Sequence, residues 1–214
     1  MIRWGLVAPV GPRVRLICGM AAYDARTALL VVDVQNDFAD SRGSLYVRGG
    51  EQIVAAANQE MRRARDGDAA VFCTQDWHPA STPHFERDGG LWPVHCLRDS
   101  WGAAFHPELQ ILDAGVVRKG TGGEDGYSAF SVRDPRTSER SATALERILR
   151  TRGVMHIVVI GLATDYCVQE TGLDAVRLGF ATTVIEAAVR AVDLDVGDGA
   201  RALAALRAAG VHIE

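Results

Sequence analysis

The sequence has 214 residues, of which 48% are hydrophobic and 23% are charged, and its formal net charge is −4 at pH 7. This length fits one large domain, and no linker, internal repeat or low-complexity tract divides the chain. The acidic balance leaves no basic stripe for nucleic acid, and no apolar run is long enough to span a bilayer. Four cysteines in a chain of this size do not form a disulfide framework pattern, so we expect a soluble protein of the reducing cytoplasm.

The first 22 residues differ from the rest of the chain. They contain three arginines and two prolines, which interrupt the apolar stretch too often for a signal peptide. We therefore expect an N-terminal extension over residues 1–22 and a single domain over residues 23–214. Translation starting at Met1 and translation starting at Met20 both remain open.

Short apolar runs bounded by turn or polar residues predict six strands. In chain order they are residues 28–32, 69–74, 116–117, 157–160, 181–185 and 211–213. Apolar residues at helical spacing predict helices around residues 53–64, 145–149, 168–176 and 203–206. Strands that alternate with helices indicate an α/β fold, with three α/β/α layers and a mostly parallel central sheet.

Residues of catalytic types follow four of these strands, namely Asp33, Asp76, Lys119 and Cys167. Because ligands of parallel sheets bind beyond the carboxyl ends of the strands, we expect these side chains to gather on one rim. Taken singly, Asp33 suits the cap of a neighbouring turn and Lys119 suits a solvated surface. Their shared position at strand ends favours a catalytic site.

Cys167 is the most informative of the four residues. It lies in the segment VVIGLATDYCVQET, just past an apolar strand and at the start of a helix. Backbone N–H groups and the helix dipole at such a position lower the pKa of a thiol and can hold an oxyanion. A buried, unreactive cysteine is the common alternative. The residues at the neighbouring strand ends favour a nucleophile.

The segment QDWHPASTPHFERDGGLWPVHC combines a carboxylate with three imidazoles, from Asp76, His78, His84 and His95. An Asp-x-His sequence places two donors on the same side of an extended chain, and a later histidine can complete the shell. Zinc, iron(II) and manganese all suit these donors. Each histidine alone would be read as an ordinary loop residue, but the group predicts a metal site.

The segment GTGGEDG after Lys119 is rich in glycine, as phosphate-binding loops are. It lacks the third glycine of a dinucleotide fingerprint, and no amphipathic helix follows it. We therefore expect a flexible rim loop that carries acidic residues.

Four segments together resemble the nicotinamidase/pyrazinamidase group of the isochorismatase-like cysteine hydrolases. They are VVDVQNDF, DWHP with WPVHC, KG with YSAF, and GLATDYCV, and the resemblance runs from about residue 28 to the C-terminus. It implies a parallel sheet flanked by helices and hydrolysis of nicotinamide to nicotinate and ammonia through a thioester, with pyrazinamide as a further substrate. It also implies one divalent metal ion, with zinc ahead of iron or manganese.

The resemblance also implies roles for individual residues. The triad residues are Asp33, Lys119 and Cys167, and the metal ligands are Asp76, His78 and His95. The walls of the substrate pocket are Phe38, Trp92, Tyr127 and Leu162, although core packing suits Phe38 and Trp92 equally well. The amides of Ala163 and Cys167 match an oxyanion hole, next to a Leu162–Ala163 bond that is cis in the family.

One departure affects the metal site. Members of the family often carry an Asn-His pair soon after DWHP, whereas this chain reads STPHF and has its histidine later, at His84. Some relatives use a histidine at this spacing as a further ligand, so the coordination number and the metal stay open.

Two alternative functions remain. Cys167 argues against a true isochorismatase, and the metal loop argues against ureidoacrylate and N-carbamoylsarcosine hydrolases. A cysteine hydrolase of another small amide is the first alternative, and a non-catalytic binding or redox-sensing domain is the second. For every enzymatic reading we expect a small-molecule amide as partner, no nucleic acid or membrane, and a homo-oligomer as a possible assembly.

Overall fold

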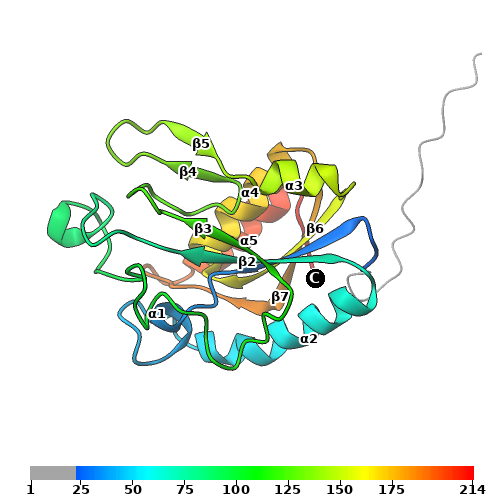
Figure 1. Cartoon of the computed structure of the whole chain (residues 1–214), viewed down its shortest axis with the longest axis horizontal. Coiled ribbons are helices and arrows are strands. Elements are labelled where there is room, and N and C mark those ends of the chain that lie inside the picture. The colour runs from blue at the N-terminus through cyan, green and yellow to red at the C-terminus, as the bar shows by residue number, and fades with distance from the viewer. Residues whose placement is uncertain (1–22) are drawn as a thin grey trace, which may run out of the picture.

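The computed structural model describes residues 23–214. Within them, six strands form one sheet in the order β3-β2-β1-β6-β7-β8, and every neighbouring pair is parallel (Figure 1). The strands are β1 (Thr27–Val32), β2 (Ala70–Asp76), β3 (Gly115–Lys119), β6 (His156–Leu162), β7 (Ala181–Arg190) and β8 (His212–Ile213). The expected extension over residues 1–22 and the choice between two start sites lie outside the described residues.

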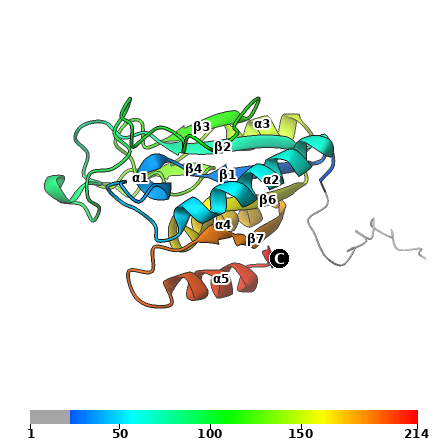
Figure 2. The same ribbon diagram turned by 90° about the horizontal axis from the view of Figure 1, so that it is seen from below.

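Helices cover both faces of the sheet. Helix α2 (Ile53–Asp66) packs on one face, and α3 (Leu145–Thr151), α4 (Gln169–Arg177) and α5 (Asp198–Ala208) pack on the other (Figures 1 and 2). Alternate residues of β1 serve the two layers, because Leu29 and Val31 join the α2 cluster while Leu30 and Val32 join the opposite one. The predicted three-layer α/β/α fold is confirmed.

The apolar spacing explains where α2 lies. Ile53, Ala57, Met61 and Ala64 are fully buried, and they recur at the interval that places residues on one side of a helix. The same cluster contains strand residues from the face of the sheet that α2 covers, such as Leu29 and Val31 of β1. The burial of this apolar stripe therefore fixes the helix against the sheet.

The structure contains elements that the periodicity did not predict. A hairpin of β4 (Ser131–Arg133) and β5 (Arg140–Ala142) forms a separate antiparallel pair, and α1 (Asn36–Ala39) follows β1. The hairpin lacks alternating apolar residues and is largely exposed, so it is held by its backbone ladder rather than by a core face. Strand β7 also continues to Arg190, beyond the predicted end at residue 185.

The order of the strands creates a crevice between β1 and β6. From β1 the chain continues to β2 and β3 on one side, whereas β6 leads to β7 and β8 on the other. Such a reversal is where open α/β sheets bind ligands. At this place Gly161 has a φ of +120°, and a Cβ on it would lie 2.1 Å from Val32 O. The close approach of the two strand ends therefore requires glycine.

No helix among residues 23–214 has the length and apolar character needed to cross a membrane.

Candidate active site

The carboxyl ends of three parallel strands bring the predicted triad together. Asp33 follows β1, Lys119 ends β3, and Cys167 lies in a π-helical turn, Thr164–Val168, directly after β6. Lys119 Nζ lies 2.8 Å from Asp33 Oδ2 and 3.7 Å from Cys167 Sγ. All three residues are buried, so their interactions are little screened by solvent.

Lys119 also contacts the predicted metal ligand at the end of β2. Its Nζ forms an ion pair of 2.8 Å with Asp76 Oδ1 and donates a hydrogen bond to Gly126 O. The ammonium group therefore lies between the two carboxylates of Asp33 and Asp76. Since two buried anions share this one cation, their protonation is coupled.

The surroundings shift the pKa values of the two carboxyl groups in opposite directions. Burial raises the pKa of Asp33 above its ordinary value, although Lys119 opposes the shift. Burial acts on Asp76 in the same direction, but Lys119 and two histidines outweigh it and hold the pKa of Asp76 well below its usual range. Two carboxyl groups whose pKa values are pushed apart suit different roles, with Asp76 as a permanent anion and Asp33 as a proton acceptor.

Cys167 differs from its sequence-based expectation. Burial raises the pKa of its thiol well above the ordinary value, and the two nearby aspartates add to the shift while Lys119 opposes it. The expected lowering of the thiol pKa is therefore wrong for this structure, because burial raises the pKa by more than Lys119 lowers it. This direction favours the protonated thiol, so attack on a substrate calls for a nearby base, and a carboxylate oxygen of Asp33 lies within 4.8 Å of the sulfur.

Thr74, in β2, fixes the carboxylate of Asp33. Its hydroxyl donates to Asp33 Oδ1 at 2.6 Å and accepts the backbone N–H of Asp33 at 3.1 Å. The sequence contained a signal for this contact, because Thr74 and Asp76 lie two residues apart on one face of a strand.

Three histidines meet beside the triad. The ligand nitrogens of His78, His84 and His95 lie within 4.8 Å of one another, and all three side chains are buried. Asp76 Oδ2 lies 3.7 Å from His78 Nε2 and 4.0 Å from His95 Nε2. The structure thus brings the four predicted metal ligands together, including His84.

The hydrogen bonds of these histidines leave nitrogens available to a metal. His84 Nδ1 contacts Asp125 Oδ1 at 2.7 Å and His95 Nδ1 contacts Pro93 O at 2.7 Å, so the Nε2 atom of each ring can coordinate. Both ring nitrogens of buried His78 have no hydrogen-bond partner among the described residues, which is rare without a ligand. Burial lowers the pKa of His95 to about 4, which keeps it in the neutral, metal-binding form. These residues fit a divalent metal.

The glycine-rich segment after β3 supplies a buried group. Asp125 is only 6% exposed, and its second carboxylate oxygen accepts hydrogen bonds from Arg133 in β4. The expectation of a flexible acidic rim loop is therefore wrong at Asp125, which links the hairpin to His84. No motif or periodicity in the sequence indicates this pairing.

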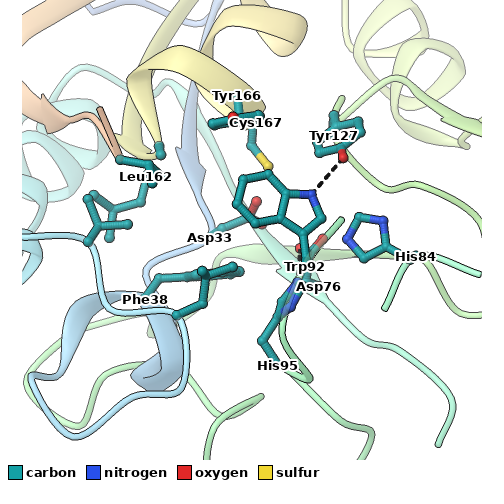
Figure 3. Close-up of a pocket in the computed structure, with 14 residues that line it drawn as sticks. Asp33, Phe38, Asp76, His84, Trp92, His95, Tyr127, Leu162, Tyr166 and Cys167 are labelled. Atoms are coloured by element: carbon teal, nitrogen blue, oxygen red, sulfur yellow. Dashed lines mark hydrogen bonds and ion pairs between the residues drawn. The ribbon is translucent and has the colours of Figure 1, made fainter. Parts of the chain in front are cut away.

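An apolar cavity opens beside the triad and the histidines (Figure 3). Its lining residues enclose about 390 Å³ of space that is partly open to solvent, so a small ligand can enter it from outside. The four predicted wall residues line it, namely Phe38, Trp92, Tyr127 and Leu162. Trp92 Nε1 donates to the hydroxyl of Tyr127 at 2.8 Å, which braces two of these walls.

Four further lining residues were not predicted, namely Leu45, Val47, Tyr166 and Val192. The ring of Tyr166 packs edge-on against Trp92, with centroids 4.7 Å apart. Its place beside Cys167 in the sequence is a usable signal, whereas the other three residues come from loops that carry none.

The peptide between Leu162 and Ala163 is cis. Ala163 O accepts the backbone N–H groups of Tyr166 and Val168, so the turn that carries Cys167 begins directly after this bond. The oxyanion hole at Ala163 and Cys167 stays a prediction.

Comparisons with known proteins place the chain in a family. A model of the isochorismatase domain matches residues 27–213. The nicotinamidase of Escherichia coli (strain K12) is 38% identical over 203 residues, which cover 87% of this chain and 93% of that protein. Among solved structures, the pyrazinamidase of Pyrococcus horikoshii in complex with zinc has a TM-score of 0.79 at 35% identity, with 88% of this chain and 98% of that chain covered. The PnC1 protein of L. infantum in complex with nicotinate has a TM-score of 0.82 at 33% identity, with 91% and 95% covered. The chain therefore belongs to the isochorismatase-like cysteine hydrolases and is similar to their nicotinamidase and pyrazinamidase members.

Proposed function

We propose that this protein hydrolyses nicotinamide to nicotinate and ammonia, and that it accepts pyrazinamide as well. One observation carries the proposal: Cys167, Asp33 and Lys119 meet at an apolar cavity with aromatic walls, beside three histidines and Asp76. The similarity to nicotinamidases over most of the chain supports the choice of substrate.

In this proposal Asp33 accepts the proton of the Cys167 thiol as the sulfur attacks the carboxamide carbon. The amides of Ala163 and Cys167 hold the resulting oxyanion. The C–N bond then breaks and the nitrogen takes the proton from Asp33. Ammonia leaves, and the acyl group remains bound to Cys167 as a thioester. Asp33 next takes a proton from water, whose oxygen attacks the thioester carbon. The C–S bond then breaks, Asp33 returns its proton to the sulfur of Cys167, and nicotinic acid leaves and ionises to nicotinate. Lys119 keeps its positive charge throughout, since Asp33 and Asp76 raise its pKa against the effect of burial.

Asp76, His78, His84 and His95 would hold one divalent metal ion, which we propose to be zinc. Such an ion supplies a Lewis acid for the ring nitrogen of the substrate. The aromatic walls at Phe38, Trp92 and Tyr127 would enclose the ring. The imidazole-rich donor set and the zinc-bound pyrazinamidase relative support the choice of metal.

We further propose a reducing location such as the cytoplasm. The cysteines among residues 23–214 are Cys73, Cys96 and Cys167, and all three are free and buried. Reducing compartments keep thiols in this state.

The test is ammonia release from nicotinamide by the zinc-loaded protein and its Cys167→Ala variant. We expect the variant to lose turnover by about a thousandfold or more, because no other group supplies the nucleophile. Cys73→Ala is the matched control, since Cys73 is a buried thiol of β2 on the other face of the sheet, and it should retain turnover. Ammonia release that persists in Cys167→Ala would contradict the mechanism. No release by the wild type would move the substrate to another small amide, and inactivity toward a panel of amides would leave a binding or redox-sensing domain.

A further inference from the structure

Three buried polar residues that the proposed reaction does not use follow Asp33 closely. They are Gln35, Asn36 and Asp37, with exposures of 0%, 3% and 8%. Buried polar side chains are costly unless they are hydrogen-bonded, so the partners of each one indicate its role. Their partners lie in different segments: Gln35 contacts the main chain of the proposed ligand Asp76, and Asp37 contacts the main chain directly after the proposed ligand His95.

Gln35 pairs with the backbone of Asp76. Its Nε2 donates to Asp76 O at 2.8 Å, and its Oε1 accepts the backbone N–H of Asp76 at 2.8 Å. A second donation from Nε2 reaches Ala103 O at 2.9 Å. Both peptide groups that flank the Cα of Asp76 are thereby fixed, and the direction of its carboxylate follows from them.

Asp37 holds the main chain next to His95. Its Oδ2 accepts the backbone N–H of Cys96 at 2.7 Å, and its Oδ1 accepts that of Ser44 at 3.0 Å. The carboxylate is tightly enclosed, because a Cβ on Gly102 would lie 2.0 Å from Oδ2. The N–H of Cys96 belongs to the peptide that joins it to His95, so this hydrogen bond fixes the backbone from which the imidazole projects.

We propose that Gln35 and Asp37 are positioning residues of the metal site, which hold the backbone at Asp76 and His95. Partners that orient metal ligands contribute to metal affinity as well as to geometry. Because Asp33 lies in the same short segment, one stretch of five residues places the proton acceptor and two metal ligands relative to one another. This inference rests on the proposed function, since it requires a metal at this site.

Asn36 provides an internal control. It is as deeply buried as its neighbours, but its Nδ2 donates to Trp101 O at 2.8 Å, which is not at a metal ligand. Gln35→Glu, Asp37→Asn and Asn36→Asp each exchange an amide and a carboxylate without changing the shape of the side chain. All three are expected to lower stability, because each leaves a buried polar group with a mismatched partner.

The experiment measures zinc affinity by competition with a chromophoric chelator, and coordination geometry by the absorption spectrum of the Co²⁺-loaded protein. We expect Gln35→Glu and Asp37→Asn to bind zinc about 10- to 100-fold more weakly than the wild type and to alter the Co²⁺ spectrum. Asn36→Asp should keep both the affinity and the spectrum of the wild type.

Wild-type affinity and spectrum in Gln35→Glu and Asp37→Asn would overturn the inference, and so would an equal loss in Asn36→Asp, which would indicate general destabilisation. If the charged replacement at position 35 does not fold, Gln35→Met carries the same test with a side chain of similar length and no charge. A wild type that binds no zinc would overturn both this inference and the proposed metal site. If the wild type binds zinc and the variants bind it equally well, only this inference is overturned, and the proposed metal site stands.

Discussion

Lys119 is the only lysine among the 23 Lys and Arg residues of the sequence. Its Nζ has three N–H donors and three oxygen partners, on Asp33, Asp76 and Gly126. An ammonium group is a compact charge that can point its donors in three directions, whereas a guanidinium is a larger planar fork. The geometry of this site therefore explains why a chain that otherwise uses arginine has lysine here.

Lys119→Arg should consequently abolish most of the activity although it keeps the positive charge. We expect kcat for nicotinamide to fall by about a hundredfold or more. The larger guanidinium would shift the carboxylate of Asp33 away from Cys167, and a misplacement of about 1 Å between reacting groups can cost that much in rate. Arg118→Lys, the reverse exchange at the adjacent exposed position, is the control and should retain turnover. Steady-state kinetics on both variants decide the matter, and a near-normal kcat in Lys119→Arg would show that charge alone suffices.

At the scale of the elements, His156 links three neighbouring strands. It begins β6 opposite Thr27 of β1 and Ala181 of β7, and its Nε2 lies 2.9 Å from Thr183 Oγ1. Burial lowers the pKa of His156, with His212 adding to the shift and Asp24 opposing it. Protonation therefore works against the packing of the sheet at this end.

The direction of the pH effect follows from this shift. Below the unfolded pKa of about 6.5 the unfolded chain binds more protons at His156 than the folded chain does, so stability is lost as the pH falls. Above that pKa the contribution is fully present. We expect His156→Gln to lose less stability between pH 7.5 and pH 5 than the wild type, as measured by urea unfolding at both pH values. Equal losses in the two proteins would mean that His156 titrates alike in the folded and unfolded states.

At the scale of the whole molecule, the parallel sheet and its helical layers could be predicted because apolar periodicity records which face of each element is buried. Helix α2 begins at the predicted residue Ile53, and β1 and β6 match their apolar runs closely. The hairpin β4–β5 and the extension of β7 to Arg190 could not be predicted in this way. The hairpin is largely exposed and leaves no apolar pattern in the sequence, whereas in the β7 extension Ala188 and Val189 are buried on opposite faces but follow Glu186, which interrupts the apolar run.

In the candidate site, too, some features could be predicted from the sequence and others could not. Asp33, Asp76, Lys119 and Cys167 could be grouped in advance, because the carboxyl ends of parallel strands meet at one edge. The carboxylate of Asp125 and the walls from loops could not, since their positions depend on where irregular segments fold back. The direction in which the pKa of Cys167 shifts was also out of reach, because it depends on how deeply the fold buries the thiol and on which charged groups surround it.

The metal should matter to the whole fold as well as to the site. Residues 77–114 connect β2 to β3 with a single 3-10 turn, Glu86–Asp88, as their regular element, and three proposed ligands lie within them. A ligand at 100 times its Kd stabilises a protein by about 2.7 kcal/mol. For a chain of this size that corresponds to about 5 to 10 °C in Tm. We therefore expect exhaustive chelation to lower Tm by this amount and to abolish ammonia release, with zinc restoring both.

The matched control for this prediction is His106→Ala, in the same connecting segment but outside the histidine cluster. It should respond to chelator and zinc as the wild type does, whereas His84→Ala should have a lower Tm before chelation and respond less to it. Calorimetry with and without chelator, on the three proteins, separates a bound metal from a general effect of removing histidine. Unchanged melting and undiminished turnover in metal-free wild type would mean that His78, His84 and His95 form a buried imidazole cluster with another role.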